Sequence, residues 1–493
     1  MYLHLFGRIG ACCILVLKST NQTTMQKAKR IFKRLFLGLI FTLFLILGIS
    51  IPYGKSTEIK IENPGISYAK LVLKNVHLLT MVDDSILKNK NLYLENGKIT
   101  YIQDDSLKIR NGYAQINAKG KFIIPGLIDM HAHIFDRNDL PQYLSYGITT
   151  VRNMMGFPMH LRWKQQLLNN ELPGSTLITA TPTINSGENA GPFHKVINDE
   201  TEMQEAVMTY AKAGYDFIKV YDDIDINQLN AIQKTAKEYD LMVAGHPPKM
   251  SFESLLSSSL ISIEHVEELR KFLDKENSDK SIKSIAKQIK KSNKAITINL
   301  IAFNRIYKTA IKGQAYLDNL NTASINPIIN YIGNKQLSDY TEAGSKYKVF
   351  AKRKFAILKK IAKALSDEGV EILLGTDSGP NLIASGKSVF EEIELLSEAG
   401  ITNYNILKSA TINAASVLQK NDIGTIQLGN KSNLILVDTN PLTNIKTLQK
   451  PLIIFKESAY YATKEINELR SIGENKQNKY ATIGLFLEHL INK

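Results

Sequence analysis

The most informative segment of the sequence is Phe122-Ile-Ile-Pro-Gly-Leu-Ile-Asp-Met-His-Ala-His133, because it reads as a buried strand that ends in two imidazoles. Side chains two residues apart share one face of a strand, so His131 and His133 project together from the end of an apolar run. Two histidines on one face can hold one metal ion, although paired histidines also occur as hydrogen-bonded core or surface residues. The stretch is therefore a candidate metal site that needs further ligands.

Further candidate ligands follow, each at or near the C-terminal end of a β-like run. They are Lys219 in residues 215–221, His246 at the end of 241–246, His265 in 263–265 and Asp377 at the end of 370–377. Segments with helical patterning separate these runs, at residues 202–213, 226–239 and 355–368. The alternation predicts a parallel barrel or a doubly wound sheet. A (β/α)8 barrel needs about 250 residues and carries its chemistry at the C-terminal ends of several strands, as residues 124–418 would allow.

With these motifs the chain resembles the amidohydrolase superfamily of metal-dependent hydrolases, and within it the imidazolonepropionase-like proteins and the Xaa-Pro dipeptidases. The motifs that carry the resemblance are Pro125-Gly-Leu-Ile-Asp-Met-His-Ala-His133, Gly147-Ile-Thr-Thr-Val-Arg152, Phe217-Ile-Lys-Val220, Ile263-Glu-His265, Gly375-Thr-Asp-Ser-Gly379, Ala410-Thr-Ile-Asn-Ala414 and Ile423-Gly-Thr-Ile-Gln-Leu-Gly429. The resemblance implies an α/β fold in which a (β/α)8 TIM barrel, residues 124–418, is inserted into a small composite β-sandwich.

The resemblance also implies a binuclear site for two divalent ions, for which zinc suits the nitrogen and carboxylate ligands best. The first ion would be held by His131, His133 and Asp377, and the second by His246 and His265. Lys219, converted by carbon dioxide to a lysine carbamate, would bridge the two ions. An unmodified lysine is a cation and cannot ligate metal, whereas a carbamate presents two oxygens and a negative charge.

Three residues are expected to act on the substrate. Asp377 would take the proton of the attacking hydroxide and pass it to the leaving group, although alone it could equally be a turn or helix-cap aspartate. His194, in the loop of residues 185–194, is a candidate substrate contact, and a solvent-facing loop histidine is the simpler alternative. Tyr221 lies two residues beyond Lys219 on the same strand face, where it could point at the substrate carbonyl or only pack.

The function that these residues imply is hydrolysis of an amide bond by a metal-bridging hydroxide, in a dipeptide or an N-acyl amino acid. Lactones and phosphoesters are alternative substrates, because the same hydroxide attacks them. A non-catalytic binding protein derived from the barrel is the alternative class. A family member that had become non-catalytic should have lost a metal ligand, whereas this sequence has a ligand-type residue at all six positions.

Between a seventh strand predicted at residues 295–302 and an eighth beginning at Val370, a largely helical insertion at residues 304–354 should cover the mouth of the barrel. Its cations could bind a substrate carboxylate, although a solvated helix face explains most of them: Arg305, Lys308, Lys312, Lys348, Lys352, Arg353 and Lys354.

The segments that flank the barrel alternate polar and apolar residues. Residues 71–77 and 91–102 read as strands, with Asn96-Gly97 as a hairpin turn, and residues 433–438 read as another strand. Residues 58–123 and 419–493 are therefore expected to pair into one β-sandwich, the second part continuing into a C-terminal tail.

Residues 1–57 are predicted to be a leader. Five cations between Lys27 and Arg34 precede the apolar run 35–51, the arrangement of a signal peptide or a membrane anchor. The run falls short of a full span of about 20 residues, which favours the signal peptide. We expect translation to start at Met25 and the protein to be exported across the cytoplasmic membrane or anchored to it, the segment contacting the membrane or the export machinery. Cys12 and Cys13 lie in this leader, so the exported protein would have no thiol.

The net charge of +14 overstates the charge of the folded protein. Residues 1–34 hold seven Lys or Arg and no acid, so without them it is 14 − 7 = +7. Residues 280–294 carry six lysines and no acid, with isoleucines at helical spacing, and an amphipathic barrel helix explains them better than an anionic partner. We expect a small-molecule or dipeptide substrate and no nucleic-acid partner; a homo-oligomer is compatible with the sequence.

Overall fold

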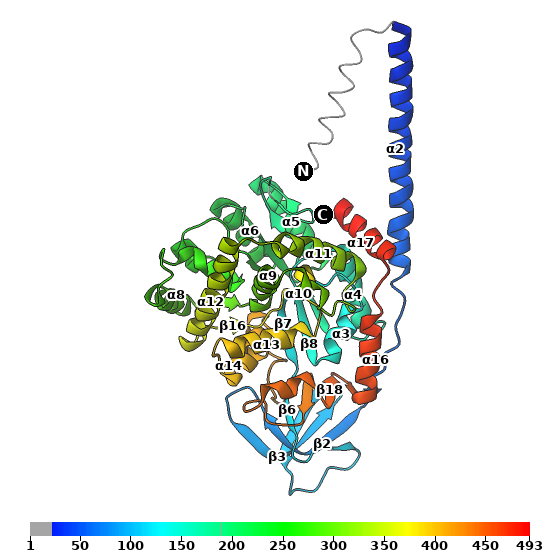
Figure 1. The fold of residues 1–493 in the computed structure, drawn as a ribbon. Coiled ribbons are helices and arrows are strands. Elements are labelled where there is room, and N and C mark those ends of the chain that lie inside the picture. The colour runs from blue at the N-terminus through cyan, green and yellow to red at the C-terminus, as the bar shows by residue number, and fades with distance from the viewer. Residues whose placement is uncertain (1–21, 189) are drawn as a thin grey trace.

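The structure is a computed structural model that describes residues 22–188 and 190–493. Cys12 and Cys13 lie outside the described residues. Figure 1 shows the barrel between a β-domain at one end and a long helix, α2 (Gln22–Ser56), that projects beyond the opposite end.

In the described part of the chain, eight parallel strands form a closed barrel. Strands β7 to β9 pair in order, and the bridge between Ala180 and Phe217 joins β9 to β12. Strands β12 to β16 pair in order, and the bridge between Ala132 and Ser378 closes the ring. The strands are β7 (Leu127–Ala132), β8 (Ile148–Asn153), β9 (Thr176–Thr179), β12 (Phe217–Val220), β13 (Met242–Gly245), β14 (Leu260–Glu264), β15 (Ala295–Thr297) and β16 (Ile372–Leu373). The predicted TIM barrel is confirmed.

Helices follow the strands and cover the outside of the barrel (Figure 1). In α8, Ile282, Ile285 and Ile289 are buried, so the expected amphipathic barrel helix is confirmed. The helices before the insertion are α3 (Asp139–Ser145), α4 (Pro158–Leu168), α5 (Glu200–Ala213), α6 (Ile226–Glu238), α7 (Phe252–Ser257) and α8 (Asp279–Ser292). Those after it are α13 (Ser388–Glu398), α14 (Asn403–Ser409) and α15 (Ile412–Val417).

The seventh barrel strand ends earlier than the sequence predicted. β15 stops at Thr297, and Asn299 takes a left-handed backbone conformation, with φ of 55°, before a helix begins at Leu300. The prediction of a strand through residue 302 was therefore wrong, because a short buried apolar run fits a strand and a buried helix equally well. The insertion consists of α9 (Leu300–Lys312), α10 (Gln314–Asp318), α11 (Pro327–Thr341) and the first part of α12 (Ser345–Asp367).

The two ends of the chain form the β-domain, which is one nine-stranded sheet within the described residues. Its order is β1-β19-β18-β17-β6-β2-β3-β4, with β5 against β2. Both halves contribute to one core, for example Leu73 and Leu434. The composite β-sandwich is confirmed, and its strands are β1 (Ile66–Ser67), β2 (Lys70–Leu79), β3 (Ile86–Glu95), β4 (Lys98–Asp104), β5 (Ala114–Asn117), β6 (Phe122–Pro125), β17 (Leu434–Val437), β18 (Ile453–Lys456) and β19 (Ala459–Tyr461).

Gly126 separates the sandwich from the barrel. β6 pairs with β17 in the sandwich, and β7 pairs with β8 in the barrel. A Cβ at Gly126 would overlap the side chain of Thr149, so only glycine allows this close approach. The stretch from Phe122 to His133 is therefore two strands in two sheets, and the passage into the barrel falls at Gly126 rather than after residue 123.

The predicted C-terminal tail is two helices, α16 (Thr463–Glu474) and α17 (Lys479–Asn492). α17 packs against the last turns of α2, where a Cβ at Gly484 would overlap the carbonyl of Ser50. Glu488 of α17 forms ion pairs with Lys55, at 2.9 Å, and with Arg162, at 2.8 Å. The end of the predicted leader, from Ser50 onward, thus belongs to the packed structure.

Among the helices that the structure describes, none combines the length and the apolarity needed to cross a membrane.

Candidate metal centre

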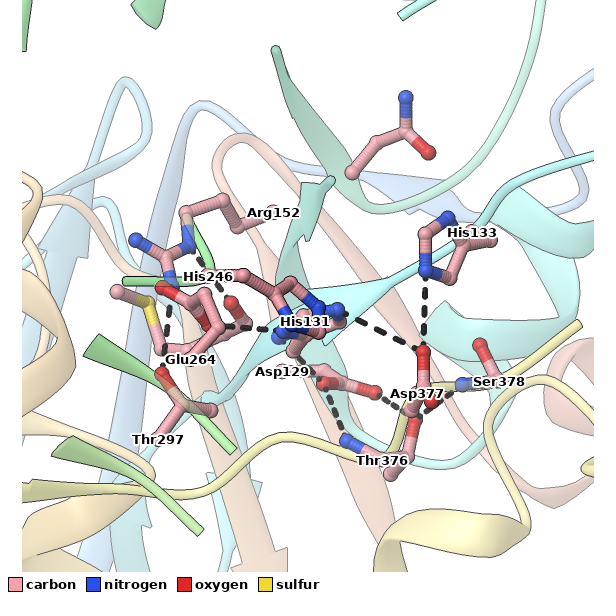
Figure 2. Close-up of polar contacts among 12 residues, drawn as sticks. Asp129, His131, His133, Arg152, His246, Glu264, Thr297, Thr376, Asp377 and Ser378 are labelled. Atoms are coloured by element: carbon pink, nitrogen blue, oxygen red, sulfur yellow. Dashed lines mark hydrogen bonds and ion pairs between the residues drawn. The ribbon is translucent and has the colours of Figure 1, made fainter. Parts of the chain in front are cut away.

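The predicted ligands meet at the C-terminal ends of the barrel strands, on the floor of a cavity of about 630 Å³. His131 lies in β7 and His133 just after it, and β12 carries Lys219. His246 and His265 directly follow β13 and β14, and Asp377 lies on the segment that continues from β16. The structure brings together all six: His131, His133, Lys219, His246, His265 and Asp377. Figure 2 shows His131 and His133 directed towards Asp377.

Asp377 is the centre of the ligand geometry. Its Oδ1 lies 3.0 Å from His133 Nε2 and 3.5 Å from His131 Nε2. The ligand atoms of His131, His265 and Asp377 all lie within 4.8 Å of one another. His246 extends the cluster, since its ring centroid is 4.6 Å from that of His265. Asp377 and His265 also adopt left-handed backbone conformations, with φ of 56° and 68°, a strained geometry that clusters at functional sites.

Two unpartnered ring nitrogens make the cluster fit a metal better than a hydrogen-bonded core. The Nδ1 atoms of His133 and His265 are buried, and neither has a hydrogen-bond partner within the described residues. A buried polar atom without a partner costs free energy, so such atoms need an explanation. Convergent imidazoles and a carboxylate are the donors that divalent transition metals prefer.

Lys219 lies at the cavity floor and is only 2% exposed. Burial, helped by the charge of Arg152 and opposed by the nearby carboxylates, lowers the pKa of Lys219 to about 8. More of its amine is therefore neutral near pH 8 than in an ordinary lysine. The carbamate itself stays a prediction.

Asp129 joins the loops that carry the first ligands. Its Oδ1 accepts hydrogen bonds from the backbone N–H groups of His131 and Thr376, both at 3.1 Å. Its Oδ2 accepts from Thr376 Oγ1, at 2.6 Å, and from the hydroxyl of Tyr143, at 3.2 Å. Burial raises the pKa of Asp129 to about 6 against these hydrogen bonds. One carboxylate thereby fixes the end of β7 relative to the segment that leads to Asp377.

Glu264 holds the ring of His131 from behind. Its Oε2 lies 2.8 Å from His131 Nδ1, and its Oε1 accepts from Arg152, at 2.7 Å (Figure 2). Burial raises the pKa of Glu264, but the charge of Arg152 and the hydrogen bond with His131 outweigh burial and hold it well below its usual range. Glu264 is therefore a carboxylate that leaves His131 Nε2 free for a metal.

No role was predicted for Asp129, Glu264 or Arg152, although each lies in one of the motifs that carry the family resemblance. The signal was present, since each is a charged residue within a barrel strand, where charges are seldom buried unless they are paired.

Gly375 allows the Asp377 segment to approach His131. A Cβ at this position would lie 2.6 Å from Thr297 Cγ2 and 2.7 Å from His131 Cβ, closer than such atoms can approach. The glycine of the Gly375-Thr-Asp-Ser-Gly379 motif is thus required by packing around the ligands.

The two predicted substrate residues both line the cavity. His194 is 7% exposed, and its Nδ1 accepts a hydrogen bond from the backbone of Gly191, at 3.1 Å, so the solvent-facing alternative was wrong. The ring of Tyr221 lies between those of His194 and His246, at centroid distances of 4.7 and 4.2 Å. Contact of either residue with substrate stays a prediction.

α17 supports the loop that carries Phe193 on the cavity wall. The ring of Phe486 lies 5.3 Å from that of Phe193, and the ring of His489 stacks on Phe157 at a centroid distance of 3.7 Å. His489 Nε2 donates a hydrogen bond to the carbonyl of Phe193, at 2.9 Å.

The cations of the insertion do not line the cavity. Arg305 donates to the hydroxyl of Tyr316, at 3.0 Å, and pairs with Glu391, at 3.1 Å. Lys354 pairs with Glu267, at 2.8 Å. The geometry therefore gives no support to the idea that these cations bind a substrate carboxylate.

Comparison with known proteins agrees with this architecture. The model of the Amidohydrolase family matches residues 122–456. Imidazolonepropionase of Shouchella clausii (strain KSM-K16) is 24% identical over 399 residues, which cover 74% of this chain and 82% of that protein. Bottromycin amidohydrolase is similar in structure, with a TM-score of 0.69 and 19% identity over 83% of this chain and 90% of that chain. A Xaa-Pro dipeptidase has a TM-score of 0.63 and 18% identity, covering 80% of this chain and 100% of that chain. This chain therefore belongs to the amidohydrolase family of hydrolases.

Proposed function

We propose that the protein is a binuclear metal-dependent hydrolase that cleaves the carbon–nitrogen bond of an amide. The observation that carries the proposal is the convergence of six ligand-type side chains from five barrel strands on the floor of one open cavity. The structurally similar proteins include an amidohydrolase and a dipeptidase, which favours an amide over a lactone or a phosphoester. N-acylated amines and dipeptides are the substrate classes to distinguish.

The chain divides its ligands between two ions, for which zinc is the best match to the donors. His131, His133 and Asp377 would hold the first ion, His246 and His265 the second, and Lys219, as a carbamate, would bridge them. Two divalent ions bound there would activate water for attack and polarise the scissile carbonyl.

Asp377 would move the proton. Burial raises the pKa of Asp377, but the hydrogen bond with His133 and the charge of His131 outweigh burial and lower it. The carboxylate therefore stays ionised and, because it lines the cavity, it can accept a proton from the attacking water. It would then donate that proton to the leaving nitrogen, which must be protonated before the C–N bond breaks.

Metal analysis of the purified protein tests the proposal. We expect close to two zinc ions per chain and complete loss of amide hydrolysis on chelation, with recovery on adding zinc. One ion or none in a fully folded chain would count against the binuclear site.

The carbamate has its own test. Lys219→Ala should lose metal and turnover, and short carboxylic acids added to this variant should restore part of the activity by replacing the bridging oxygens. Lys294→Ala is the control, since Lys294 is also buried but donates to the carbonyl of Leu260, away from the cavity. Normal metal content and turnover in Lys219→Met would rule out a bridging lysine.

A further inference from the structure

The cavity beyond the ligands has an apolar wall. Phe193, the insertion helices and the segment after β7 supply it, and its main side chains are Phe135, Phe193, Phe303, Ile306, Ile329 and Ile332. Among the described residues that line the cavity, Lys219 is the only lysine or arginine, and it lies with the ligands on the floor. A group that extends from the reaction centre into this space therefore meets mainly apolar side chains, with Gln336 and Asn381 as neutral polar groups, and no further lysine or arginine of the lining.

Two carboxylates on the wall reinforce this selection. Glu267 and Glu268 line the cavity, and each is already paired, Glu267 with Lys354 and Glu268 with Lys271. Glu268 Oε1 also lies 3.5 Å from His246 Nδ1, so this carboxylate borders the ligands. An anionic group in the cavity would lie near these carboxylates without a free cation to pair with, and burying an unpaired charge is costly. The wall thus disfavours the carboxylate of a dipeptide or of an N-acyl amino acid.

We infer that the substrate is an N-acyl amide whose acyl group is apolar and uncharged and whose amine carries no carboxylate. This inference rests on the proposed amide hydrolysis and names the substrate class for it. Apolar burial gives each added methylene about a fourfold advantage in binding until the cavity is full. The cavity volume of about 630 Å³ lies in the range of sites that enclose a whole small molecule.

A series of acyl 4-nitroanilides tests the inference on the zinc-loaded full-length protein. From acetyl through butyryl and hexanoyl to octanoyl, we expect kcat/KM to rise by about fourfold per methylene until it levels off. The succinyl anilide, which has the length of the butyryl compound but ends in a carboxylate, should be at least about tenfold poorer. Succinyl or dipeptide substrates that match or exceed the butyryl compound would overturn the inference.

A charge placed in the wall should invert the preference. Ile332→Arg puts a cation beside the acyl group, so it should lower kcat/KM for the octanoyl anilide and raise it for the succinyl anilide. Ile332→Met keeps the wall apolar and is the matched control, which should preserve the order of the series. Circular dichroism and thermal unfolding verify that both variants fold. A folded Ile332→Arg protein with the original order would contradict an acyl site at this wall.

Binding without turnover separates this inference from the proposed function. Calorimetry with octanamide and with succinamic acid should give tighter binding of octanamide, whether or not either compound is cleaved. Selective binding of octanamide with no hydrolysis of any anilide would leave the apolar site standing and refute the amide hydrolase. Hydrolysis that favours charged substrates would support the amide hydrolase and refute the apolar acyl site.

Discussion

The floor and the wall of the cavity differ in the side chains that form them and in the segments of the chain that supply these side chains. On the floor, short motifs at strand ends place the ligands, and buried polar partners such as Glu264 and Asp129 fix their orientation. On the wall, apolar side chains come from insertion helices and from a loop that the C-terminal helix supports. The chemistry is therefore specified by local sequence, whereas the selectivity depends on contacts between distant segments.

Asp377→Asn should have the largest effect and act on the floor alone. The amide oxygen can still approach a metal, but the proton acceptor is lost, so turnover should fall by about 10² to 10⁴ while zinc content falls modestly. The loss should appear in kcat more than in KM, because proton transfer matters as the bond breaks. Asp367→Asn, at the exposed end of α12, is the control and should be silent. Near-normal turnover in Asp377→Asn would assign the proton to another group, such as His194.

Glu264→Gln should reduce zinc affinity or activity by about 10- to 100-fold, because the charge that orients His131 is lost. The variant also leaves Arg152 as a buried cation without its partner, which costs about 3–5 kcal/mol of unfolding free energy. Adding Arg152→Met should restore stability without restoring zinc affinity. Denaturant unfolding and zinc titration of both variants separate the two effects, and full recovery of zinc affinity in the double variant would contradict the positioning role.

His489→Ala should act on the wall and spare the floor. It removes the stack on Phe157 and the hydrogen bond to Phe193, so unfolding free energy should fall by about 1–2 kcal/mol. KM for the octanoyl anilide should rise by about three- to tenfold with zinc content unchanged. A loss of zinc in this variant would mean that the contacts of His489 also affect the metal ligands on the floor.

His489 should also make the free energy of unfolding depend on pH. Burial lowers the pKa of His489 to about 4, against a value of about 6.5 in an unfolded chain. Between these values the unfolded chain binds a proton that the folded protein does not, so this contribution to stability is complete above about pH 6.5 and is lost as the pH falls towards 4. His489→Gln should flatten the unfolding free energy across this window, and an unchanged profile would assign the dependence to other groups.

Arg305→Met should have the smallest effect. Its guanidinium pairs with Glu391 outside the cavity, so kcat/KM should stay within about twofold for neutral and anionic substrates alike. A fall in kcat/KM for anionic substrates alone would show that Arg305 helps to bind a substrate carboxylate. The wall would then not be a purely apolar counterpart to the polar floor.

The sequence predicted the floor well because its signals are local. His131 and His133 are two residues apart on a strand, and each of the other four side chains lies at or near the C-terminal end of an apolar run, where a barrel carries its chemistry. The family resemblance then named these six as one ligand set. The start of α9 could not be predicted, since residues 300–302 are buried and apolar as either strand or helix. The pairing of Arg305 with Glu391, and the fold of α17 onto Phe193, join residues far apart in the chain, and no local pattern reports such contacts.

The support that α17 gives to the Phe193 loop also sets an order of events during synthesis. A chain emerges N-terminus first, at about 5–20 residues per second, so every ligand up to Asp377 is made before Lys479. The last strands of the sandwich and then α17 arrive at the end. The side chains proposed as metal ligands are therefore all made before the helix that supports the pocket wall. The contacts that hold the Phe193 loop therefore form only after the final helix has been made.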